Sequence, residues 1–231
     1  MDKHNFPGNT PDDDDIKGLI KRFEDMLASG DVYYFESDEL EEIIDHYFNE
    51  GNPTNLKKAI DFALDRYPNV ADFKIARAQF LAYNQKTQEA LKLLNDVELV
   101  EPSNPDIYTT RGYIYSQMGL SEQAVENYKA ALTYTDQPDE VMVALGTEFL
   151  SQEKYLDAIY YLKKAAKHNP GNDYALSELF IAFDSAQKLN EGVEFFQQLI
   201  DENPYNHFAW FNFGLCCSKT GSHDKALEAY D

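Results

Sequence analysis

The chain of 231 residues has few cysteines, few basic residues and no long apolar run. Its two cysteines, Cys216 and Cys217, are adjacent, which excludes the disulfide framework that supports small secreted domains. No apolar run approaches the roughly 18–20 residues that a transmembrane helix needs. Residues 1–15 lack the apolar core of a secretory signal. These absences predict a cytoplasmic protein.

Basic side chains are half as frequent as acidic ones. The sequence has 20 Lys and Arg against 41 Asp and Glu, which gives a formal net charge of −21. Such a surface repels phosphate backbones and anionic lipids, so neither nucleic acid nor a membrane is expected as a partner. The charge favours basic partners, although acidity also serves solubility alone.

Patterns that carry catalytic or metal chemistry are also lacking. The five histidines are scattered, and none stands in the spacing of a zinc site. The run from Asp12 to Asp15 lacks the alternate spacing and the glycine of a calcium loop. The sequence shows no glycine-rich phosphate loop and no nucleophile beside an evident base, and both cysteines are predicted to pack in the core. We therefore expect no catalytic site, no cofactor and no metal, and the protein is not predicted to be an enzyme.

What the sequence does contain is a ladder of prolines. Pro68 and Pro102 are 34 residues apart, and so are Pro170 and Pro204, while Asp136 fills the slot between the two pairs. A fixed period of this length is typical of a repeat architecture. The predicted repeats are 37–70, 71–104, 105–138, 139–172, 173–206 and an incomplete 207–231.

Each repeat reads as two amphipathic helices. In the third repeat, Tyr108, Gly112 and Tyr115 share one face of the first helix, and Gly119 marks the turn. Small residues recur at position 8 of the repeat, where Gly112 stands, and at position 20. We expect these small residues to lie where two helices approach closely. In the fifth repeat Phe180 replaces the small residue, and Gly192 is expected to compensate for it.

This pattern resembles the tetratricopeptide repeat family over most of the chain. The last repeat matches the family's marked positions best, with Trp210, Phe213, Gly214, Gly221, Ala226 and Tyr230. The resemblance implies an all-α fold, a right-handed α-α superhelix (solenoid) of helix-turn-helix units. It also implies a concave groove lined mostly by the first helices.

The two ends of the chain differ from the repeats. Residues 16–36 are predicted to form an N-terminal capping helix and a linker, with Ile16, Phe23 and Leu27 on its apolar stripe. Residues 1–15 are predicted to be a disordered acidic tail. Because the sequence stops inside a predicted helix, we expect it to be part of a longer protein.

The family resemblance assigns the groove to defined positions of each repeat. It implies a partner-binding groove that is acidic at one end and aromatic or apolar at the other. Its acidic residues are Asp38, Glu41, Glu42 and Asp45, with Asp72 and Glu178 at equivalent positions, and the remaining candidates are Gln79, Tyr83, Tyr113, Tyr174, Ile181, Phe208, Phe211, Asn212 and Leu215. The Asn212 amide is expected to hold a peptide backbone.

Chaperone-binding members of the family grip a carboxylate with Lys and Asn at two of these positions. Glu41 and Asp45 stand there in the first repeat, so that clamp is absent. The sequence thus predicts a scaffold for a protein or peptide that is basic or mixed basic and apolar. Two alternatives stay open: self-association through the open C-terminal helix, or a recruiting domain of a longer enzyme or sensor. Phe208 and Phe211 could equally pack against a missing continuation, and the acidic residues could simply be solvated.

Overall fold

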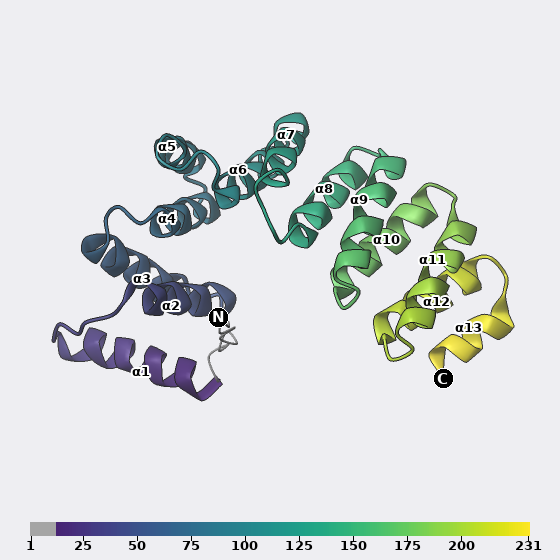
Figure 1. The fold of residues 1–231 in the computed structure, drawn as a ribbon, viewed down its shortest axis with the longest axis horizontal. Helices are drawn as coiled ribbons and strands as arrows, with labels where there is room; N and C mark the ends of the chain where they lie inside the picture. Colours follow the sequence, from purple (N-terminus) through teal and green to yellow (C-terminus); the bar gives the residue numbers. More distant parts are fainter. Residues whose placement is uncertain (1–12) are drawn as a thin grey trace, which may run out of the picture. The chain divides into compact units, whose positions relative to one another are not determined.

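The computed structural model describes residues 13–231, which form thirteen α-helices and no β-strand (Figure 1). This confirms the predicted all-α fold class. The acidic tail lies outside the described residues, except that residues 13–15 belong to the first helix and not to the tail. The described residues divide into two compact units, an N-terminal one that ends at Glu101 and a C-terminal one of residues 102–231, a division that the sequence did not predict. None of the described helices is both long and apolar enough to cross a membrane.

The N-terminal unit contains five helices. They are α1 (Asp13–Ser29), α2 (Ser37–Asn49), α3 (Pro53–Arg66), α4 (Ala71–Tyr83) and α5 (Thr87–Glu98). Phe23 of α1 packs against two further phenylalanines: the ring centroids of Phe23, Phe35 and Phe62 lie 5.7–5.9 Å apart, each pair edge to face. Phe23 is fully buried, whereas Leu27, predicted on the same stripe, is 36% exposed and Met26 is buried in its place.

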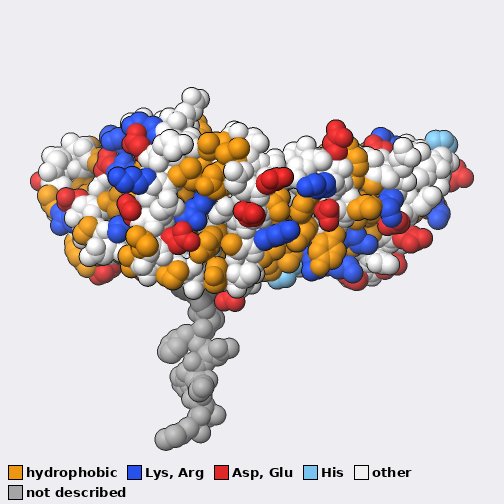
Figure 2. Space-filling model, turned by 90° about the horizontal axis from the view of Figure 1, so that it is seen from above, with side chains coloured by type: hydrophobic (Ala, Val, Ile, Leu, Met, Phe, Trp, Pro, Cys, Tyr) orange, Lys and Arg blue, Asp and Glu red, His pale blue; other side chains and the backbone are white. Residues whose placement is uncertain are grey.

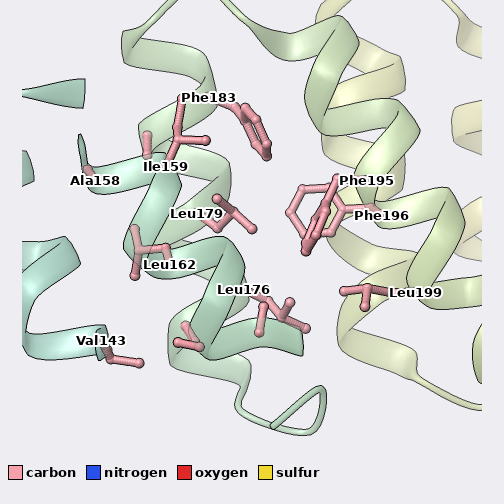
Figure 3. Packing of buried hydrophobic residues seen from close by; sticks show 14 of the residues in the cluster. Val143, Ala158, Ile159, Leu162, Leu176, Leu179, Phe183, Phe195, Phe196 and Leu199 are labelled. Carbon is pink, nitrogen blue, oxygen red and sulfur yellow. The ribbon is translucent and has the colours of Figure 1, made fainter. Parts of the chain in front are cut away.

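The C-terminal unit contains four helix pairs. They are α6 (Pro105–Gln117), α7 (Ser121–Ala131), α8 (Asp139–Ser151), α9 (Tyr155–His168), α10 (Asp173–Ser185), α11 (Leu189–Glu202), α12 (His207–Lys219) and α13 (His223–Tyr230). Figure 3 shows the core between α9, α10 and α11, where Leu162, Leu179 and Phe196 are fully buried. Burial of this apolar surface is the main force that joins the pairs.

The recurring glycine at position 8 lies against a large residue of the paired helix. A Cβ on Gly112 would lie 2.7 Å from Tyr128 Cδ1, and one on Gly214 would lie 2.6 Å from Tyr230 Cε1. Gly146 faces Leu162 in the same way. The predicted close approach is therefore present, and position 24 supplies the partner.

The turn between the helices of each pair has a left-handed residue. Gly51, Gly119 and Gly221 have φ of 64°, 70° and 81°. At the same repeat position, Gln85, Glu153 and Gln187 have φ of 61°, 59° and 59°. The sequence predicts such a turn only at Gly119, and L residues are not expected there because they pay a steric cost in this conformation.

Side chains also fix the turn between successive repeats. The Asn172 and Asn206 carboxamide oxygens accept from Ala175 N at 2.9 Å and from Ala209 N at 3.0 Å, capping α10 and α12. Asn206 Nδ2 donates to Pro170 O at 2.7 Å, which ties two consecutive turns together. The carbonyl of Pro204 accepts from the Trp210 indole at 2.8 Å. At Pro170 and Pro204, the proline ladder thus marks turns whose proline carbonyl groups accept side-chain hydrogen bonds.

The sequence predicts that Gly192 compensates for the large Phe180, but its neighbours in the structure are other side chains. A Cβ on Gly192 would lie 3.0 Å from Cys216 Sγ and 3.1 Å from Phe183 Cδ2. The glycine therefore makes room for these two side chains, because α11 packs against α12 of the next repeat. Phe180 is half-buried, and Lys219 Nζ lies 5.7 Å from its ring centroid.

Candidate functional site

Exposed apolar side chains gather on two neighbouring first helices of the C-terminal unit. Tyr174 of α10 and Phe208 and Phe211 of α12 retain 55%, 46% and 53% of their accessible surface. Ile181 of α10 is also exposed. Because α10 packs against α12, we call these four residues the aromatic face. On the view drawn in Figure 2, hydrophobic side chains likewise reach the surface among charged ones.

A carboxyl group lies within this face. Burial raises the pKa of Glu178, and its hydrogen bond with the Tyr174 side chain lowers the pKa only in part. Burial and the neighbouring Glu178 carboxylate in turn raise the pKa of Tyr174. A cation placed beside Glu178 would favour its charged form.

Asn212 does not lie where the sequence places it. Its side chain is 1% exposed, and Nδ2 donates to Phe208 O of the same helix at 2.8 Å. Its Oδ1 has no hydrogen-bond partner among the described residues. The expectation that this amide meets a peptide backbone is therefore wrong for the structure as it stands, because the residue turns inward. Leu215, one turn further along α12, is half-buried.

The N-terminal unit has an acidic face on α2 and α4. Asp38 and Asp45 are exposed on α2, while Glu41 between them is half-buried. Burial raises the pKa of Glu41, and the charges of Asp72 on α4, then Asp38 and Asp45, raise it further. Glu41 is therefore close enough to Asp72, Asp38 and Asp45 for their charges to act on it, and a cation beside Glu41 would favour its charged form.

The other predicted groove residues lie at the surface of their own unit. Glu42 and Gln79 are half-buried, whereas Tyr83 and Tyr113 are exposed. Tyr83 belongs to the N-terminal unit and Tyr113 to the C-terminal unit.

Comparison with known proteins decides the family. Two family models, both described as tetratricopeptide repeat, match residues 105–137 and 143–207. The chain belongs to the tetratricopeptide repeat family. It is similar to the TPR repeat-containing protein YpiA of Bacillus subtilis (strain 168), with 22% identity over 184 residues that cover 79% of this chain and 43% of YpiA.

This TPR chain is also similar to a second curated protein and to a solved structure. The uncharacterized protein ycf37 of Cyanophora paradoxa is 30% identical over 147 residues, 62% of this chain and 83% of that protein. The crystal structure of YrrB, described as a TPR protein with an unusual peptide-binding site, is 21% identical with a TM-score of 0.54, covering 74% of this chain and 88% of YrrB. The chain spans at most 43% of the length of the first three curated relatives it matches.

The TPR fold implies a scaffold for protein–protein interaction, and proteins of this family are generally non-catalytic. Cys216 and Cys217 are both fully buried and unpaired, as the sequence predicts for packing residues. Burial raises the pKa of the Cys216 thiol to about 12, so it is a poor nucleophile. Among the described residues, no group of three His, Cys, Asp or Glu side chains could hold a metal ion.

Proposed function

We propose that this TPR chain is a non-catalytic scaffold that holds a protein segment on the first helices of its repeats. The segment is basic or mixed basic and apolar. Its apolar side chains lie on the aromatic face, and its basic side chains lie beside Glu178 in the same unit. The acidic face of the N-terminal unit is a separate surface that favours basic side chains. The setting is cytoplasmic, where buried cysteines stay reduced.

One observation carries this proposal: Tyr174, Phe208 and Phe211 are exposed together on adjacent helices. Large aromatic side chains exposed on adjacent helices often mark a contact surface. Tyrosine and phenylalanine supply much of the apolar contact in protein interfaces. The raised pKa values of Glu41 and Glu178 add the preference for a cation, since each carboxylate lacks enough positive charge nearby.

The test is cross-linked capture of partners from a native lysate, with the bound segment identified by mass spectrometry. The parent chain is compared with a Tyr174→Ser, Phe208→Ser, Phe211→Ser variant and with a control, Tyr205→Ser, Leu227→Ser. The control residues are 84% and 66% exposed and lie in the same unit. We expect a basic or basic-apolar segment to be captured by the parent and the control and lost from the triple variant.

Circular dichroism checks that all variants stay helical. A segment captured equally by all three chains would move the site to another surface. Capture of the chain itself, lost when Tyr230 of α13 is changed to Ser, would favour self-association through the last helix instead. An acidic captured segment would contradict the proposed charge preference.

A further inference from the structure

A basic hollow lies in the C-terminal unit, on its second helices. It has a volume of about 370 Å³ and lies between α9 and the start of α11. The aromatic face, by contrast, belongs to the first helices α10 and α12. The two surfaces therefore use different sides of the helix pairs.

One stripe of α9 supplies most of the lining. Leu156, Tyr160, Lys163, Lys164 and Lys167 follow one another at helical spacing and all line the hollow. Leu156 is 64% exposed and Tyr160 is 52% exposed, although both are large and apolar. The stripe thus begins with exposed apolar residues and ends with lysines.

The lysines are placed over aromatic rings. Lys164 Nζ lies 4.4 Å from the ring centroid of Tyr160, and Lys163 Nζ lies 5.0 Å from that of Phe195 on α11. Within residues 15–231, no carboxylate pairs with the ammonium groups of Lys163, Lys164 or Lys167. Cation–π contact therefore positions the ammonium groups of Lys163 and Lys164, and none of the three lysines is neutralised by a carboxylate of the described residues.

The opposite edge of the hollow comes from α11. Lys188 is the N-cap residue of this helix, and it pairs with Glu191 in the first turn. The lining therefore contains four lysines and one glutamate. The hollow therefore carries a net positive charge, whereas the chain as a whole has a net charge of −21.

We propose that this hollow is a second docking site, for an acidic protein segment that carries a large apolar side chain. Acidic side chains pair with Lys163, Lys164 and Lys167, and the apolar side chain lies on Leu156 and Tyr160. The proposal is independent of the aromatic face, whose proposed partner is basic or mixed basic and apolar.

Electrostatic range favours a short acidic segment over a polyanion. Charges are screened beyond about 8 Å at physiological ionic strength, so a ligand inside the hollow meets mainly the lysines. A nucleic acid or an anionic membrane extends past the hollow and meets the acidic surface, which repels it. The apolar surfaces of Leu156 and Tyr160 gain nothing from contact with a bare phosphate, whereas an apolar side chain would bury surface against them.

The probe is a short fluorescein-labelled peptide of Asp and Glu around one Leu and one Phe, followed by fluorescence anisotropy. We expect saturable binding that weakens as salt is raised. A Lys163→Glu, Lys167→Glu variant should bind at least about tenfold more weakly. The matched control, Lys58→Glu, Lys92→Glu, changes the net charge equally at exposed lysines of the N-terminal unit and should bind like the parent.

Further variants and a second peptide separate the apolar contribution to binding from the electrostatic one. The same peptide with Ser in place of Leu and Phe should bind several-fold more weakly, and Leu156→Ser should remove that difference. The Tyr174→Ser, Phe208→Ser, Phe211→Ser variant should bind the acidic peptide like the parent, so failure of the proposed function would leave this site intact. Should the double Glu variant unfold, Lys163→Ala, Lys167→Ala replaces it.

Three results would overturn the proposal: no binding by the parent, equal loss in both Glu variants, or equal binding of the Ser peptide. Equal loss of affinity in both Glu variants would show that the peptide responds only to the net charge of the chain. If tripolyphosphate displaced the peptide, and the Ser peptide bound as tightly as the original peptide, the hollow would be a site for phosphate groups instead.

Discussion

Gly112 of α6 and Tyr128 of α7 touch so closely that a Cβ on Gly112 would lie 2.7 Å from two carbons of the Tyr128 ring. Gly146 and Gly214 meet Leu162 and Tyr230 in the same manner. In these three repeats, the glycine at position 8 thus makes room for one large residue of its own helix pair. This relationship explains why the small and large positions recur together along the sequence.

The Gly112→Ala substitution should lower the free energy of unfolding by about 1–3 kcal/mol, because the buried Tyr128 ring must shift to admit the methyl group. Gly18→Ala is the matched control. Gly18 lies in α1 with no atom within 4 Å of an added Cβ, so alanine should stabilise the helix by up to about 1 kcal/mol. Urea unfolding followed by circular dichroism measures both. Equal effects of the two substitutions would contradict the packing account.

At a left-handed turn position, changing a residue to glycine should raise stability, whereas replacing Gly112 should lower it. Gln187 has φ of 59°, so Gln187→Gly should raise stability by about 0.5–1 kcal/mol. Relief of strain, roughly 1–2 kcal/mol, exceeds the greater freedom that glycine has when unfolded, about 0.4–1 kcal/mol. The reverse substitution, Gly119→Gln, should destabilise the third repeat by a similar amount. Thermal unfolding of both variants tests this, and a loss of stability in Gln187→Gly would be evidence against strain at this turn.

Asn172 and Asn206 both cap a helix, and Asn206 also donates a hydrogen bond to the preceding turn, so the two contributions to stability can be measured separately. Asn172→Ala should cost about 1 kcal/mol, the value of a lost cap. Asn206→Ala should cost about 1 kcal/mol more, because it also removes the bond from Nδ2 to Pro170 O and leaves that carbonyl unpaired. Denaturant midpoints at constant slope give the comparison. If the two variants lose the same stability, the bond between consecutive turns contributes nothing.

The acidic face makes stability depend on pH. The pKa of Glu41 is raised by burial and then by Asp72, Asp38 and Asp45, so the folded chain binds this proton more tightly than the unfolded chain. Stability therefore falls as pH rises through the window between the unfolded and folded pKa of Glu41. Glu41→Gln should stabilise the N-terminal unit above that window, and the gain should vanish below it. Unfolding curves across acidic and neutral pH show this, and a gain that persists at low pH would exclude the ionisation as its cause.

The proline ladder together with the amphipathic faces was enough to predict the helix pairs, because turns and close contacts recur at fixed positions of the repeat. Exposure of Tyr174, Phe208 and Phe211 also follows from their repeat positions. The inward turn of Asn212 and the partners of Gly192 could not be predicted, because they depend on how α11 and α12 pack between repeats. The lysine stripe of α9 was readable from Leu156, Tyr160 and Lys164 at helical spacing, but the family pattern directs attention to first helices only.

The central claim is that the aromatic face holds the partner segment. Isothermal titration of the segment identified by capture tests it most directly, with the parent chain, the Tyr174→Ser, Phe208→Ser, Phe211→Ser variant and the Tyr205→Ser, Leu227→Ser control. We expect the triple variant to bind at least about tenfold more weakly while the control binds like the parent. A folded triple variant that binds with the affinity of the parent would contradict the claim.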